Sequence, residues 1–195
     1  MQNNLDWLNI VAFDYPTIQE NFTAAHAPLY DPGSQTNTDF GMRSWIGSGV
    51  SADKLVLGLP FYGYVWKLKN SQDTAIGAPA TGPVVMEQGE HRMSYKDIKD
   101  YIQRYGAASI YNATYVVNYC TNGSTWIGFD DIEAVNQKVS YAKDKGLLGY
   151  YVWRTSKDDN WMLSSTAGKI GLPTEPPTVI QLALRRLTTK INGKV

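Results

Sequence analysis

Short apolar runs recur along the chain, and their composition predicts strands of a buried parallel sheet. Three of them stand out, at residues 8–15 (LNIVAFDY), 54–66 (KLVLGLPFYGYVW) and 146–153 (GLLGYYVW). Each is rich in β-branched and aromatic residues and lacks a regular polar alternation, which is typical of strands that are covered on both faces. Helical patterns between such runs are typical of an α/β fold.

Helices are expected wherever capping residues precede a helical apolar pattern. The pattern predicts a short helix at 40–48 that ends at Gly49, and a second helix that starts at Ser94 and ends at Gly106. Two more helices are expected to open at the acidic clusters 130–133 and 158–160. We interpret both clusters as helix caps, because carboxylates stabilise helix N-termini.

The region from residue 67 to residue 129 differs from the apolar runs around it. Residues 67–83 have the Gly, Pro, Asn and Thr content of a loop, while 114–120 and 125–129 are strand-like and flank a hairpin signal, TNGS. We expect a small α+β subdomain at 67–129. Past Pro173 the chain is predicted to continue as a linker with a short basic tail, in which Arg185 and Arg186 lie on a solvated face.

Charge and composition exclude several classes of partner. The formal net charge is zero, so nothing favours nucleic acid or an anionic membrane, and no run reaches the length of a membrane span. His26 and His91 are isolated and Cys120 is the single cysteine, so neither a metal site, a cofactor nor an internal disulfide is expected. The glycosylation candidates are Asn21, Asn112 and Asn122.

Aromatic residues are abundant, with thirteen Tyr and six Trp. Asp14 closes the first apolar run and Trp153 closes the last, and barrel enzymes keep their chemistry at the carboxyl ends of parallel strands. Flat rings there could stack on sugar faces. Tyr62, Tyr64, Trp66 and Trp126 are weaker candidates of the same kind, for which packing in the core is the favoured interpretation.

The order of these segments resembles the C-terminal half of the plant class V chitinases of glycoside hydrolase family 18. The resemblance covers residues 5–172 and rests on the segments LDWLNIVAFDY, APLYDP, KLVLGLPFYGYVW, MSYKDIKDYI, YNATYVVNYC, WIGFDD, VSYAKDKGLLGYYVW and DDNWMLS. It implies that residues 1–172 are the C-terminal part of a (β/α)8 TIM barrel with an inserted α+β subdomain, followed by the tail at 173–195. A whole barrel takes about 250 residues, so the three strands should be the last three of eight.

The resemblance implies chitin or its N-acetylglucosamine oligomers as the ligand. In the family the sugar's own N-acetyl oxygen attacks the anomeric carbon, while a Glu of a D-x-x-D-x-D-x-E motif on the fourth strand acts as general acid. The 195 residues contain no segment with this spacing. The chain alone is therefore expected to be catalytically incomplete.

The resemblance also assigns substrate-binding residues. The family carries Met-x-Tyr-Asp where this chain has Val11, Ala12, Phe13 and Asp14, so the Asp is kept and the Tyr hydroxyl is lost. Loss of that hydroxyl removes one hydrogen bond to the charge-developing intermediate, which is worth about 1.5–3 kcal/mol. Tyr15 is adjacent but should point to the other side of the strand. Trp153 matches the Trp that floors the reacting-sugar subsite. The resulting candidates are Asp14, Trp153, Phe13, Tyr15, Tyr62 and Trp66.

Two functional hypotheses stay open. The chain could be part of a longer hydrolase, whose missing N-terminal half of the barrel would then be its partner. It could instead be a non-catalytic module that binds chitin oligosaccharides, as a lectin or a receptor ectodomain does, and Phe13 favours this second hypothesis. The resemblance implies an extracellular or vacuolar location, although the start MQNNLDWLNI lacks the features of a signal peptide.

Overall fold

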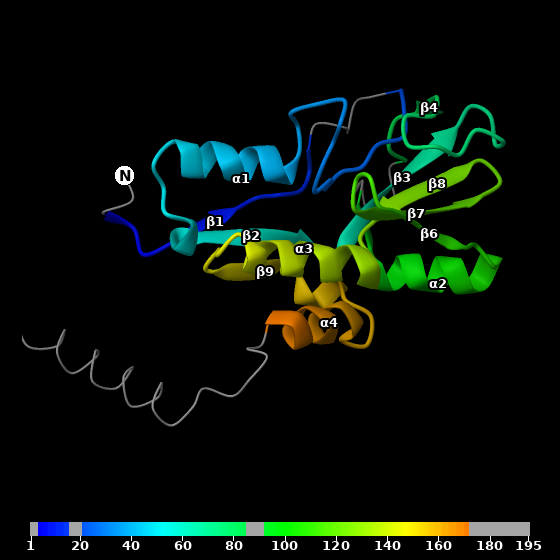
Figure 1. Cartoon of the computed structure of the whole chain (residues 1–195). Coiled ribbons are helices and arrows are strands. Elements are labelled where there is room, and N and C mark those ends of the chain that lie inside the picture. The colour runs from blue at the N-terminus through cyan, green and yellow to red at the C-terminus, as the bar shows by residue number, and fades with distance from the viewer. Residues whose placement is uncertain (1–3, 16–20, 85–91, 172–195) are drawn as a thin grey trace, which may run out of the picture.

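A computed structural model describes residues 4–15, 21–84 and 92–171 (Figure 1). The strands are β1 (Leu8–Ile10), β2 (Leu55–Pro60), β3 (Tyr62–Leu68), β4 (Ala80–Thr81), β5 (Arg92–Ser94), β6 (Ser109–Asn112), β7 (Val117–Asn122), β8 (Thr125–Phe129) and β9 (Gly149–Trp153). The α-helices are α1 (Thr38–Gly47), α2 (Tyr95–Tyr105), α3 (Ile132–Asp144) and α4 (Met162–Gly171), with short 3₁₀ helices at Ala52–Lys54 and Thr155–Lys157. The expected α/β fold is confirmed.

The first sheet is parallel and has the order β1-β2-β9. All three apolar runs contribute a strand to it, as predicted. Alternate residues of β2 face the helices and share one core with them. This core includes Leu55, Leu57, Leu59, Met42 of α1, Val135 and Val139 of α3, and Leu163 of α4.

The segment 54–66, which we predicted as a single strand, forms two strands in different sheets. Phe61 is the point of change: its N–H donates to the carbonyl of Trp153 at 2.9 Å, and its own carbonyl accepts from the N–H of Tyr95 at 3.0 Å. β2 ends before Phe61, and β3 after it belongs to an antiparallel sheet of order β4-β3-β8-β7-β6, with β5 also paired to β3. This second sheet lies beyond the carboxyl ends of β2 and β9 (Figure 1).

The predicted helix caps are confirmed. Ser94 accepts from the N–H of Asp97 at the start of α2, and Gly106 ends that helix with φ of 62°. Asp131 is the N-cap of α3. Asp158 accepts from the backbone N–H groups of α4, which makes both acidic clusters structural.

Other element boundaries differ from the prediction. β1 stops at Ile10 instead of continuing to Tyr15, and β6 was not predicted at all. The strand expected at 114–120 begins only at Val117, because the Asn112 side chain accepts from the N–H groups of Thr114 and Tyr115 and holds a turn there. The tail at 173–195 lies outside the described residues, as does His91.

The parallel sheet has two open edges within the described ranges, because β1 and β9 each pair with β2 alone. Exposed apolar side chains lie near both edges: Val11, Leu148 and Trp153. No helix in the described part of the chain is long and apolar enough to cross a bilayer.

Candidate functional site

Asp14 lies just past the carboxyl end of β1, where the chain turns. Its φ is 57°, a left-handed conformation that Asp tolerates better than most residues and that ends the extended run from β1. The turn directs the Asp14 carboxylate to the first strand of the second sheet. Asp14 Oδ1 accepts from the hydroxyls of Tyr62 at 2.5 Å and Tyr64 at 2.9 Å.

Arg92 completes this cluster from β5. Its Nη2 lies 2.6 Å from Asp14 Oδ2, and its Nε donates to the Tyr64 hydroxyl at 3.1 Å. Its guanidinium also lies 5.2 Å from the centre of the Tyr62 ring. Asp14, Tyr62, Tyr64 and Arg92 therefore form one connected polar group, which we call the Asp14 cluster.

The Asp14 cluster leaves room for one further donor. Burial, followed by the hydrogen bond to Asp14, raises the pKa of Tyr62, so its phenol stays protonated and donates. A carboxylate offers about four acceptor positions, and the described contacts use two on Oδ1 and one on Oδ2. Asp14 remains partly exposed and can accept one more hydrogen bond from an external N–H or O–H group.

Phe13 and Tyr151 lie beside the Asp14 cluster, on the face of the sheet that points away from the helices. Phe13 is buried and packs edge-on against Tyr62 and Tyr151, with ring centres 6.1 and 6.3 Å apart. Gly58 of β2 makes this approach possible, since a Cβ there would lie 2.7 Å from the Tyr151 hydroxyl oxygen and 2.8 Å from Phe13 Cε1. Sequence reasoning missed Tyr151, although it lies two residues before Trp153 and so on the same face of β9.

Trp153 ends β9 opposite Pro60, at the same carboxyl edge of the parallel sheet as Asp14. Its side chain is 52% exposed, which is unusual for so large an aromatic residue at the end of a buried strand. The ring is therefore available to an apolar ligand surface.

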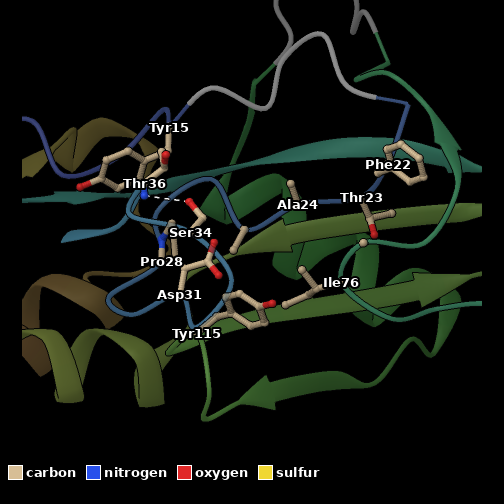
Figure 2. A pocket seen from close by; sticks show the side chains of 12 residues that line it. Tyr15, Phe22, Thr23, Ala24, Pro28, Asp31, Ser34, Thr36, Ile76 and Tyr115 are labelled. Atoms are coloured by element: carbon tan, nitrogen blue, oxygen red, sulfur yellow. Dashed lines mark hydrogen bonds between the residues drawn. The ribbon is translucent and has the colours of Figure 1, made fainter. Parts of the chain in front are cut away.

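Tyr15 makes its contacts outside the Asp14 cluster, but the predicted strand alternation is not the reason, because β1 ends at Ile10. Its hydroxyl donates to Thr38 Oγ1 at 3.3 Å, and its ring lines a different cleft of about 400 Å³ (Figure 2). Phe22 and Tyr115 supply the other rings of that cleft, and Asp31 and Ser34 supply oxygens already used by turn N–H groups of residues 33 and 36. Tyr15 is thus separated from the Asp14 cluster.

The two tryptophans of the second sheet are fully buried. Trp66 and Trp126 pack edge-to-face at 5.3 Å, and Trp126 donates its ring N–H to the carbonyl of Thr74. No face of either ring is open to a sugar. Both tryptophans therefore pack in the core, as the favoured interpretation of the sequence had it, and Trp66 is not a substrate-binding residue.

Two of the three sequons, Asn112 and Asn122, lie in strands of the antiparallel sheet, and Asn21 lies in the segment that bonds to Ala80 of β4. Asn21 and Asn122 are exposed, the latter in the β7–β8 hairpin, whereas Asn112 is half-buried with its side-chain oxygen used in the turn described above. Within the described ranges, no group of three or more His, Cys, Asp or Glu residues could hold a metal ion.

Comparisons with known proteins agree on one family. Residues 1–158 match the model of glycosyl hydrolases family 18. A class V chitinase from Lotus japonicus is 44% identical over 84% of this chain and 41% of its own length, and a class V chitinase from Arabidopsis thaliana is 41% identical over 86% and 44%. The chain therefore belongs to glycoside hydrolase family 18, and its fold is of the α/β TIM-barrel type.

Solved structures give the same result. The class V chitinase of Nicotiana tobaccum superposes with a TM-score of 0.85 at 42% identity, covering 89% of this chain and 51% of the tobacco chain. The chitinase-like agglutinin of Robinia pseudoacacia has a TM-score of 0.80 at 39% identity, covering 88% and 48%. The chain spans about half the length of the relatives it matches.

Proposed function

We propose that this chain is the C-terminal part of a family 18 barrel and forms one side of a groove for β-1,4-linked N-acetylglucosamine oligomers. The proposal rests on two residues at the carboxyl end of the same parallel sheet. Trp153 is exposed at the end of β9, and Asp14, which follows β1, keeps a free acceptor position. A family 18 chitinase from Cycas revoluta, 36% identical with a TM-score of 0.80, was solved in complex with (GlcNAc)3.

Each of the two residues would take a different part of the sugar. Trp153 would stack on the apolar face of a pyranose ring. Asp14, already fixed by Tyr62, Tyr64 and Arg92, would accept the N–H of the N-acetyl group at its remaining position. Phe13 stands where the resemblance places a Tyr, so it supplies a packed ring without the hydroxyl.

Binding is the first test of this function. We expect NMR titration with an N-acetylglucosamine tetramer to give a dissociation constant in the millimolar range, because an open groove buries little of the ligand. Trp153→Ala should abolish the shifts. Trp7→Ala is the matched control, since Trp7 is similarly exposed, at 55%, but precedes β1 at the opposite end of the strand. Equal binding by wild type and Trp153→Ala would place the site elsewhere.

We further propose that the 195-residue chain does not hydrolyse these oligomers by itself. No D-x-x-D-x-D-x-E segment is present, so the leaving oxygen has no positioned acid, and Asp130, Asp131 and Asp158 have structural roles. A fluorogenic chitin-oligomer assay should show background rates. Turnover that disappears on Asp14→Ala would contradict this proposal.

A second candidate function is sugar binding without catalysis in the whole protein. It is favoured by the Phe at position 13 and by the similarity to the Robinia agglutinin. The coding sequence upstream of Met1 separates the two: an intact acid motif there supports a hydrolase, and a degraded one supports a lectin or receptor module. An extracellular or vacuolar location remains a proposal that follows from the family alone.

A further inference from the structure

His26 is buried directly behind the Asp14 cluster. It is 2% exposed, and neither ring nitrogen makes a hydrogen bond of good geometry within the described part of the chain, although the backbone of Tyr62 lies close enough to the ring to favour its protonation. A buried polar side chain without partners costs stability and calls for a physical explanation. The surroundings of this imidazole suggest one.

The imidazole contacts both tyrosines that hold Asp14. It stacks on Tyr62 with ring centres 5.5 Å apart and planes 27° apart, and it meets Tyr64 at 5.1 Å and 69°. Tyr62 and Tyr64 themselves meet edge-on at 6.1 Å. The three rings therefore form a compact aromatic block, and two of them end in the hydroxyls that donate to Asp14 Oδ1.

A second connection runs through the backbone. The carbonyl of His26 accepts the N–H of Tyr15, the residue after Asp14, at 3.0 Å. His26 thus contacts both partners of the hydrogen bonds from Tyr62 and Tyr64 to Asp14. Its ring packs against the two donor tyrosines, and its carbonyl holds the turn that carries the Asp14 acceptor.

The imidazole suits this position only when it is uncharged. Burial, then the positive charge of Lys138, lower the pKa of His26 to about 3, although Asp14 opposes the shift. A charged imidazole would be attracted by Asp14 but repelled by Lys138 and Arg92, and its charge would be buried away from water. A neutral ring acts as a flat packing surface and leaves the carboxylate to its three donors.

We propose that His26 is a positioning residue for the sugar site: its ring plane holds the Tyr62 and Tyr64 hydroxyls on Asp14. The expected effect of His26 on sugar binding rests on the proposed function. Its effect on the positions of the Tyr62 and Tyr64 hydroxyls can be measured without sugar. It also explains why the family resemblance did not identify His26, which contacts no proposed ligand atom.

Two substitutions separate the ring plane from the volume it fills. His26→Phe keeps a flat ring and removes the nitrogens, whereas His26→Leu keeps comparable volume and removes the plane. Met42→Ala is the control, because Met42 is 1% exposed in the helix-side core and has no contact with the Asp14 cluster among the described interactions. It should lower stability without moving the tyrosines.

The first measurement is the NMR signal of the Tyr62 hydroxyl proton in the tyrosine-labelled full chain. A hydroxyl held on a carboxylate exchanges slowly with water. We expect the signal in wild type, His26→Phe and Met42→Ala, and its loss by fast exchange in His26→Leu. Retention of the signal in His26→Leu, or its loss in His26→Phe as well, would overturn the positioning role of the ring plane.

The second measurement is titration with the N-acetylglucosamine tetramer. We expect binding at least threefold weaker for His26→Leu and within twofold of wild type for His26→Phe. If the hydroxyl signal depends on the ring plane but wild type binds no sugar, the positioning role holds and the proposed function fails. If wild type binds and His26→Leu binds equally well, the role of His26 in this site is wrong.

Discussion

At the scale of single residues, the burial of His26 gives folding a pH dependence in the acid range. The pKa of His26 is about 3 in the folded chain and 6.5 in the unfolded one, so between these values only the unfolded chain takes up the proton. The contribution of the neutral His26 ring to the free energy of unfolding is fully present above pH 6.5 and is lost progressively as the pH falls to about 3. The charged groups that face the ring are Asp14, Arg92 and Lys138.

Denaturant unfolding of wild type and His26→Phe at several pH values tests this dependence. The stability of the variant relative to wild type should increase as the pH falls from 6.5, by up to roughly 3–5 kcal/mol near pH 3. The difference arises because the Phe ring has no proton to gain. Parallel stability curves for the two proteins across this range would show that His26 is not buried as a neutral ring.

The ion pair of Lys138 and Asp130 is a second buried polar feature. Lys138 donates to both Asp130 Oδ2 and the carbonyl of Ala27, and both side chains are at most 3% exposed. Lys138→Met should destabilise the fold by about 3–5 kcal/mol, because it leaves Asp130, whose pKa burial already raises, and the carbonyl of Ala27 buried without their donor. Thermal or denaturant unfolding measures the loss.

The exposed pair of Lys96 and Asp100 provides the control for that measurement. Both side chains are more than half exposed, so water screens their attraction. Lys96→Met therefore removes a Lys–Asp ion pair that, unlike the pair of Lys138 and Asp130, is not buried. It should change stability little or not at all. Similar losses for both variants would mean that Lys138 is hydrated in solution and not buried as described.

At the scale of the elements, the site depends on how closely its rings approach β2. Gly58→Ala would drive a Cβ into the Tyr151 hydroxyl, Phe13 and the carbonyl of Ile10, all within 2.8 Å. We expect a loss of about 1–3 kcal/mol and weaker sugar binding. Gly149→Ala in the neighbouring strand is the control, since nothing lies within 4 Å of its Cβ position. Equal unfolding midpoints for the two variants would contradict this packing.

The elements that were predicted correctly are those with strong local signals. Ser94, Gly106 and Asp131 mark helix ends through their own side chains or backbone freedom, so the sequence around them was sufficient. The hairpin at Thr121–Ser124 is similar: β7 and β8 flank it, and Gly123 has φ of 56°.

The elements that were missed depend on partners far away in the sequence. The break at Phe61 follows from hydrogen bonds to Trp153 and Tyr95, which no local pattern in an uninterrupted apolar run encodes. The short strand β6 exists because β7 lies beside it. His26 had no neighbouring motif, and its role depends on Tyr62 and Tyr64, which are far along the chain.

At the scale of the whole molecule, the chain covers about half of each relative, and its parallel sheet has three strands within the described residues. A closed barrel removes its sheet edges, whereas β1 and β9 are both open here. Asn9 and Val11 on one side and Leu148 on the other are exposed. These surfaces fit the proposal that further strands complete the sheet in a whole barrel.

The open edges predict that the isolated 195-residue chain self-associates. Unpaired strand edges beside exposed apolar side chains template pairing with other chains. Size-exclusion chromatography with light scattering over a concentration series should show mass rising with concentration. Val11→Lys should reduce the association, since Val11 is 61% exposed beside the β1 edge and a charge there opposes edge pairing.

Co-expression with the N-terminal half of a class V relative should give a defined one-to-one complex. A monomer at every concentration, with one cooperative unfolding transition, would show instead that the three-stranded sheet is stable alone and that the chain is not an incomplete barrel.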